Sequence, residues 1–178
     1  MIKFTLNDKV YDIPSSWDNV TIADFRALMK VVRNQAMYGS DLIFSLNLVS
    51  AVTKIPYEIL QDITTEDFDR LQVLISWTNK MATPSDNKEF IIKGIKYIPI
   101  TKFNELKMGE VISCELLIKD SEPDELAGNL MPILIRRATK YKRNDVPSDF
   151  DSKDYEDNKE LFLHNLSIRD ALRYKDFF

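Results

Sequence analysis

Charged side chains are concentrated in one segment of this sequence, residues 136–160. Five cations come first, and seven carboxylates follow, interrupted by two lysines. These residues are Arg136, Arg137, Lys140, Lys142 and Arg143, then Asp145, Asp149, Asp151, Asp154, Glu156, Asp157 and Glu160. Two interpretations are open. One is a helix C-terminus carrying cations, which the helix dipole favours, followed by a solvated acidic loop. The other is an arm that docks on a neighbouring subunit through complementary charge.

Aromatic residues support the second interpretation of this segment. Tyr141, Phe150 and Tyr155 lie among the charges, and exposed aromatics in a polar loop could anchor a partner. Nucleic acid is a weaker candidate, because the acidic residues would repel phosphate. Phe177 and Phe178 at the C-terminus either close a core or insert into a partner. The candidate partner-binding residues are therefore the five cations, these three aromatics and the two terminal phenylalanines.

Outside this segment, the sequence lacks the patterns that enzymes and metal sites need. None of its four glycines precedes a Lys-Ser or Lys-Thr pair, so no phosphate loop is present. The single histidine, His164, and the single cysteine, Cys114, do not have the spacing of zinc ligands. The carboxylates of Glu66, Asp67 and Asp69 fall where a helix cap is expected. The sequence predicts a protein that is not an enzyme and that has no cofactor and no metal.

Length and composition indicate a folded protein that works through protein contacts. At 178 residues and 44% hydrophobic content, the chain can bury a substantial core. A net charge of −4 does not favour general binding to nucleic acid. No apolar run approaches the ~20 residues that span a bilayer, so no membrane partner is expected.

The elements that position these residues are repeated. Residues 2–54 align without a gap on residues 88–140, and the match consists of packing positions. Matched pairs include Phe4 with Phe90, Tyr11 with Tyr97, Trp17 with Phe103, Ile22 with Met108 and Lys54 with Lys140. Reactive groups are almost absent from the match. The sequence therefore predicts a duplicated scaffold rather than a duplicated active site.

Each copy is expected to be a β-hairpin followed by about three helices, which makes the chain α+β. Asn7-Asp8 and Lys93-Gly94 predict the hairpin turns, because Asn, Asp and Gly tolerate positive φ. Thr21 and Asp24 have capping-box spacing and predict a helix start, whereas Lys107 replaces this threonine in the second copy. Residues 40–53 predict a helix that lines up with residues 126–139.

The sequence divides into a first copy at 1–81, a turn-rich linker at 82–88 and a second copy at 89–178. Capping-box patterns at Thr64 and Ser167 are 103 rather than 86 positions apart, so seventeen residues are inserted around 141–159. Surface loops accept such insertions at little cost. Because an isolated hairpin is marginal in water, the two hairpins are expected to pair into one small antiparallel sheet. The two units then lie side by side or pack about a pseudo-twofold axis.

Residues 9–25, KVYDIPSSWDNVTIADF, resemble the opening of small proteins encoded in the structural gene clusters of tailed bacteriophages. The likeness is to phages of Bacteroidetes, crAss-like phages included, where a y-x-i-P-x-x-W-x-d-l-T-l-x-x-f pattern follows a short hairpin. Residues 51–58, AVTKIPYE, are similar to the l-t-g-i-p-y-e stretch of the same proteins, except that Lys54 stands where glycine is common. The likeness extends loosely through both copies.

This resemblance implies a tail, neck-ring or baseplate protein, or a tail-assembly chaperone, with no catalytic residues to carry over. The expected function is a non-enzymatic virion structural protein of the tail, neck or connector region, made in the host cytoplasm. Its expected partners are other phage structural proteins and copies of itself. The alternative is a chaperone that holds a tail protein in an apolar groove between its two units and is absent from the virion. An enzyme with a divergent site would need a deep pocket around His164 with convergent carboxylates.

Overall fold

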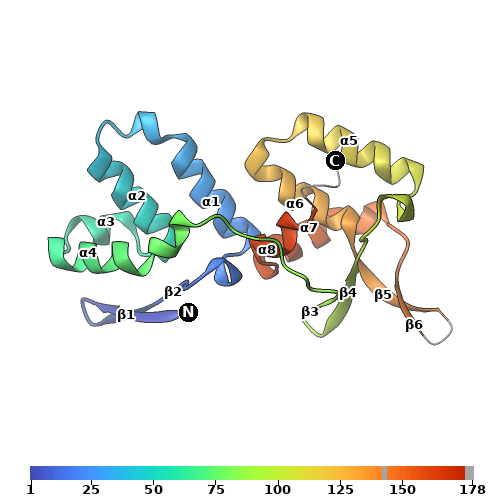
Figure 1. Ribbon diagram of the computed structural model, residues 1–178, viewed down its shortest axis with the longest axis horizontal. Coiled ribbons are helices and arrows are strands. Elements are labelled where there is room, and N and C mark those ends of the chain that lie inside the picture. Colours follow the sequence, from blue (N-terminus) through green and yellow to red (C-terminus); the bar gives the residue numbers. More distant parts are fainter. Residues whose placement is uncertain (142–143, 175–178) are drawn as a thin grey trace.

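The computed structural model describes residues 1–141 and 144–174, which form an α+β protein with two halves along its long axis (Figure 1). The first half contains β1 (Ile2–Leu6), β2 (Lys9–Ile13), η1 (Trp17–Asn19), α1 (Ile22–Arg33), η2 (Gln35–Met37), α2 (Asp41–Thr53), α3 (Tyr57–Gln61), α4 (Thr65–Leu74) and η3 (Ser76–Asn79). The second half contains β3 (Phe90–Ile92), β4 (Ile95–Pro99), η4 (Phe103–Glu105), α5 (Met108–Asp120), α6 (Pro123–Leu134), β5 (Ile135–Tyr141), β6 (Asn144–Pro147), η5 (Ser152–Asp154), α7 (Tyr155–Asn165) and α8 (Ile168–Leu172).

Both predicted hairpins are confirmed, and they share one register. Phe4 pairs with Tyr11 in the first half, and Phe90 pairs with Tyr97 in the second. Both turns place two central residues at positive φ, as a type I′ turn requires: Asn7 (48°), Asp8 (59°), Lys93 (50°) and Gly94 (77°). In each half the hairpin leads into a short 3-10 turn and then a long helix.

The two hairpins do not pair with each other, so the expectation of one shared sheet is wrong. β1 and β2 form a two-stranded sheet, whereas the second sheet has the order β3-β4-β5-β6. β5 takes the place beside β4, with Arg136 opposite Ile98. Each hairpin turns its aromatic face onto helices of its own half, so neither needs the other to close a core.

The helix expected at residues 126–139 ends early, which corrects both its bounds and the setting of the cations. α6 stops at Leu134, and the chain continues as strand β5. Pro132 lies in the last turn of α6 and cannot donate a backbone hydrogen bond to the preceding turn. Arg136, Arg137 and Lys140 therefore lie on a strand and not at a helix C-terminus.

The predicted helix starts are confirmed. Thr21 and Ser167 each form a complete capping box with the aspartate three residues later, and the Thr64 hydroxyl accepts the Asp67 amide. At Lys107 only half of the arrangement remains, because its backbone N–H donates to the Glu110 carboxylate at 2.7 Å. α4 ends at Leu74 instead of continuing to residue 81.

Two hydrophobic cores lie side by side and are joined by tryptophans. Trp17 and Trp77 both pack against the two cores, with ring centroids 5.0 Å apart in an edge-to-face arrangement. Val20 and Ile22 belong to the first half by sequence but are buried in the second core. The halves differ after α2 and α6, since α2 leads to two helices and α6 leads to a strand pair. A common origin of the halves stays a prediction.

Candidate protein–protein interface

The two halves meet through a short backbone ladder between residues 20–22 and residues 166–168. The Ile22 amide donates to the Leu166 carbonyl at 3.1 Å, and the Ile168 amide donates to the Val20 carbonyl at 2.9 Å. Thr21 lies opposite Ser167 in this antiparallel pair. Both residues are helix N-caps, so the contact joins the starts of α1 and α8.

Above this ladder, α1 packs against α6 and α7. A Cβ built on Gly128 of α6 would lie 2.6 Å from Leu163 Cδ2 and 3.9 Å from Ile22 Cγ2, so the glycine allows all three helices to approach closely. Ion pairs extend the contact outward. Arg26 pairs with Glu125, and Arg33 lies 3.1 Å from Glu122. The α1 face is thus covered by apolar contact at its start and by matched charge farther along.

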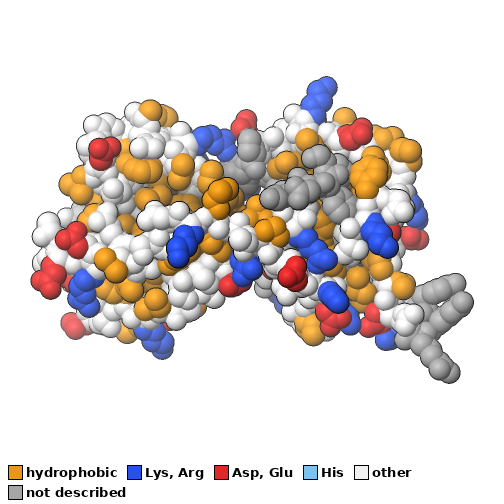
Figure 2. Space-filling model, in the orientation of Figure 1, with side chains coloured by type: hydrophobic (Ala, Val, Ile, Leu, Met, Phe, Trp, Pro, Cys, Tyr) orange, Lys and Arg blue, Asp and Glu red, His pale blue; other side chains and the backbone are white. Residues whose placement is uncertain are grey.

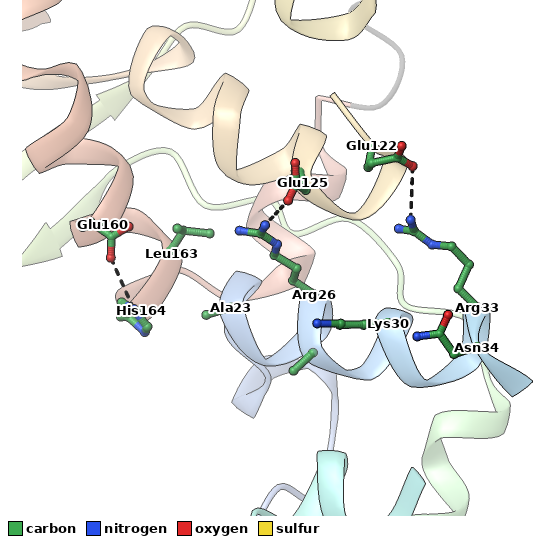
Figure 3. A pocket seen from close by; sticks show the side chains of 11 residues that line it. Ala23, Arg26, Lys30, Arg33, Asn34, Glu122, Glu125, Glu160, Leu163 and His164 are labelled. Atoms are coloured by element: carbon green, nitrogen blue, oxygen red, sulfur yellow. Dashed lines mark hydrogen bonds and ion pairs between the residues drawn. The ribbon is translucent and has the colours of Figure 1, made fainter. Parts of the chain in front are cut away.

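A cleft of about 620 Å³ lies beside this contact, lined by side chains from α1, α6 and α7 (Figure 3). Arg26 and Arg33 point toward Glu125 and Glu122, so these carboxylates face guanidinium groups rather than each other. His164 lies at the edge of the cleft and is exposed, 3.6 Å from Glu160 one helical turn earlier. The cleft is therefore a contact between helices in which arginines of α1 are paired with glutamates at the start of α6.

The structure separates the residues predicted to form a binding arm. Arg136 is buried, and its Nη2 lies 3.0 Å from Oε2 of the equally buried Glu110. Its Nε also donates to the Ile133 carbonyl. The neighbouring Cys114 is fully buried, and this burial raises the pKa of its thiol to about 11. The prediction that Arg136 contacts a partner is therefore wrong, because its charge is already compensated inside the second core.

The predicted aromatic anchors also face inward. Phe150 and Tyr155 are half-buried against the second core, and the Tyr155 hydroxyl donates to the Asn129 carbonyl at 2.8 Å. Burial raises the pKa of Tyr155 to about 12. The interpretation of these two residues as exposed anchors is therefore wrong. The inserted segment is a part of the fold that supplies β6 and the start of α7.

Other members of the predicted arm remain at the surface or lie outside the described residues. Arg137 and Lys140 are exposed, and Lys140 pairs with Asp145 on β6. Hydrogen bonds from Lys140 and Lys96 hold the pKa of Asp145 below its usual value. The Tyr141 side chain and Lys142, Arg143, Phe177 and Phe178 lie outside the part of the chain that the structure describes.

The largest departure from the sequence prediction is an exposed apolar stripe on α5. Met108, Ile112 and Leu116 recur every four residues and are 74%, 50% and 55% exposed. Hydrophobic side chains gather over this helix in Figure 2. The opposite face of α5 carries the buried Cys114, so the helix is apolar on two sides. That two-sided pattern is the sequence signal, since a surface helix normally has one apolar face.

A second open surface lies at the other end of the molecule, between β1 and α4. This groove of about 670 Å³ is lined by residues that include Ile2, Phe4, Val73 and Leu74. In the second half, the linker crosses the corresponding face of α8. There, the Ser85 amide donates to the Arg169 carbonyl.

Comparison of the chain with protein families, with curated proteins and with solved structures found no match. None of the helices in residues 1–141 and 144–174 combines the length and the apolar character needed to cross a membrane. The geometry of the described residues and the resemblance in residues 9–25 and 51–58 are therefore the basis for a functional proposal.

Proposed function

We propose that this chain is a non-enzymatic structural protein of a tailed-phage virion, in the tail, neck or connector region. It acts through contacts with copies of itself and with neighbouring structural proteins. The observation that carries the proposal is the stripe of Met108, Ile112 and Leu116 on α5. The resemblance of residues 9–25 to phage structural-cluster proteins supplies the setting.

The stripe supports an interaction role because of where its side chains lie. Three large apolar residues at four-residue spacing cover about 12 Å of helix surface, given a rise of about 1.5 Å per residue. Contiguous exposed apolar patches on folded proteins mark interaction sites. Burial of such side chains contributes about 25 cal/mol per Å² of apolar surface removed from water. On the equivalent face of α1, Ile22 is buried and Arg26 pairs with Glu125 within the chain, so the α5 face could pack on a partner in a related way.

Quantitative mass spectrometry of purified phage particles, beside the infected-cell lysate, tests the proposal. We expect the chain in particles at a fixed copy number that matches the symmetry of the tail or neck. Abundance in the lysate combined with absence from particles would overturn it in favour of an assembly chaperone. The groove between β1 and α4 is the feature that favours this alternative, because it could hold an extended segment of a client, although it lies within the first half and carries charged as well as apolar side chains.

A variant can tie the α5 stripe to this role. Ile112→Lys places a charge in the middle of the stripe and is expected to abolish incorporation into particles, while the monomer stays folded. Val10→Lys is the matched control, because Val10 is 55% exposed on β2, away from the stripe. Equal incorporation of the two variants would show that the α5 stripe is not a contact surface.

A further inference from the structure

Each half of the chain carries two backbone edges, but only one edge of each half is used within the molecule. Residues 20–22 of the first half pair with residues 166–168 of the second. At the sequence offsets of 86 and 103, the matching segments are residues 106–108 and residues 63–65. We call residues 20–22 and 106–108 the entry edges, and residues 63–65 and 166–168 the receiving edges. The second entry edge and the first receiving edge lie at the surface.

The polar groups of the two unused edges match those of the used pair. In the contact between the halves, the four groups that bond are the Ile22 and Ile168 amides and the Val20 and Leu166 carbonyls. Their counterparts are the amides of Met108 and Thr65 and the carbonyls of Leu106 and Ile63. Across residues 1–141 and 144–174, none of these four counterparts makes a hydrogen bond. Met108 and Thr65 are both exposed residues, so the two edges lie on the outside of the protein.

We propose that residues 106–108 of one copy pair antiparallel with residues 63–65 of a second copy, as residues 20–22 pair with 166–168 within the chain. The Met108 amide then donates to the Ile63 carbonyl, and the Thr65 amide donates to the Leu106 carbonyl. The inference rests on the proposed function, because it names the partner that covers the α5 stripe. That partner is another copy of this chain.

Side chains around the two edges are complementary. Lys107 stands at the entry edge where the first half has Thr21, and the receiving edge opens α4 with two acidic residues, Glu66 and Asp67. Lys107 Nζ lies 2.7 Å from Asp149, but both side chains are largely exposed, so this ion pair is weak and can be exchanged. In the pairing, Lys107 can bind Glu66 or Asp67 of the second copy, which explains why a lysine rather than a capping threonine stands at this edge.

The α5 stripe has a matching apolar surface on the receiving side. Within the chain, Ile22 packs over Gly128 of α6. The residue of the first half that matches Gly128 is Leu42 of α2, which is 63% exposed. Met108, which matches Ile22, has a flexible side chain that can pack against the larger leucine. Contact between α5 and α2 would therefore bury apolar side chains from both copies.

This pairing builds an open and directional assembly. Helices α3 and α4 of the first half lie toward one end of the long axis, whereas α5 begins toward the other end (Figure 1). One chain therefore cannot satisfy both unused edges by itself. A contact between two different surfaces generates a ring where the rotation closes and a filament where it does not. Either outcome suits a structural component that is present in many copies.

Disulfide trapping with two single variants tests the pairing. In the chain Thr21 lies opposite Ser167, and opposed residues of an antiparallel pair have Cα atoms about 4.5–5.5 Å apart, within the reach of a disulfide. Lys107→Cys and Thr64→Cys are the corresponding changes on separate copies. Mixed and oxidised, they are expected to give a disulfide-linked dimer, while each variant alone stays monomeric on a non-reducing gel. Cys114 is buried and its thiol is protonated at neutral pH, so it does not compete.

Two controls make the trapping decisive. Thr21→Cys with Ser167→Cys in one chain should form the intramolecular disulfide and report that the geometry is suitable. Lys93→Cys, at the tip of the second hairpin, mixed with Thr64→Cys measures random collision. A yield for the Lys107–Thr64 mixture no higher than this random control would overturn the pairing.

Thr65→Pro removes one backbone donor while leaving the helix start intact. Thr65 is the first residue of α4, where proline is favoured, and Thr64 already has the extended backbone that proline requires before it (φ −69°, ψ 156°). The variant is expected to lower self-association at least tenfold in sedimentation velocity, whereas Thr65→Ala, which keeps the N–H, should associate normally. Equal association of the two variants would contradict the proposed hydrogen bond. A chain that is present in particles at fixed copy number but gives no trapped dimer would refute this pairing and leave the proposed function standing.

Discussion

The two halves of this protein begin alike and then treat the same positions in opposite ways. Both open with a hairpin of one register, a 3-10 turn and a long helix. In the first half, the face of that helix toward α6 starts with the buried Ile22 and continues with arginines that pair with glutamates at the start of α6. In the second half, the matching face is apolar and exposed. The first half therefore packs this helix face against α6 within the chain, whereas the second half leaves the aligned face exposed.

For the carboxylates in the first turns of α1 and α5, it is the second half that has the more buried ion pair. Asp24 lies 3.0 Å from Lys54, whose side chain is mostly exposed. Glu110 instead pairs with Arg136 inside the core. The second half, which has the exposed helix face, thus anchors α5 to β5 through a buried charge pair. This pair holds the stripe in a fixed orientation, which an interface needs.

The largest effect is expected from breaking the buried pair. Arg136→Met leaves Glu110 buried without its cation and should lower the free energy of unfolding by about 3–5 kcal/mol. Lys54→Met, the matched change in the first half, removes an exposed partner and should cost less than about 1 kcal/mol. Urea unfolding measures both changes.

A double variant separates charge from packing in this experiment. Glu110→Gln added to Arg136→Met removes the uncompensated charge and keeps an acceptor for the Lys107 amide, so part of the lost stability should return. A loss for Arg136→Met as small as that for Lys54→Met would show that the two carboxylates occupy equivalent environments.

The next largest loss of stability is expected at the aromatic residue that precedes the first long helix of each half. Trp17 packs edge-to-face on Trp77 and donates from Nε1 to the Lys80 carbonyl at 2.7 Å, so Trp17→Ala should cost about 3 kcal/mol. Phe103 at the matching position is half-exposed, and Phe103→Ala should cost less than about 1 kcal/mol. Thermal and urea unfolding provide the measurement. Equal losses would mean that the second half buries its aromatic as fully as the first.

Local features of this fold could be predicted from the sequence because short-range physics determines them. The hairpin turns require residues that accept positive φ, and the caps at Thr21, Thr64 and Ser167 require an oxygen and a carboxylate at fixed spacing. These signals act within a few residues. They also located the starts of α1, α4 and α8 correctly.

Features that depend on distant partners could not be predicted in the same way. Residues 135–141 resembled the end of a helix, and only pairing with β4 makes them a strand. Arg136 resembled a surface cation, because its buried partner Glu110 is on a different element. The stripe on α5 was visible as apolar residues, but the face that stays open depends on how α6 and β5 pack. Long-range burial therefore decides which of the aligned residues are left exposed as candidate contacts.

The smallest expected change in the free energy of unfolding concerns the two aligned lysines, Lys54 and Lys140. Glycine at these positions is expected to have opposite effects in the two halves. Lys54 follows α2 in the left-handed conformation (φ 61°), where glycine is favoured, whereas Lys140 lies in strand β5. Lys54→Gly relieves about 1 kcal/mol of backbone strain and loses a weak ion pair, so it should stabilise the protein by about 0.5 kcal/mol. Lys140→Gly weakens an extended strand and should cost about 0.5–1 kcal/mol.

Lys54→Ala controls for the ion pair, because it loses the charge without relieving the strain and should be slightly destabilising. Differential scanning calorimetry resolves the two signs, and a loss of stability in both glycine variants would show that the backbone at Lys54 is not strained.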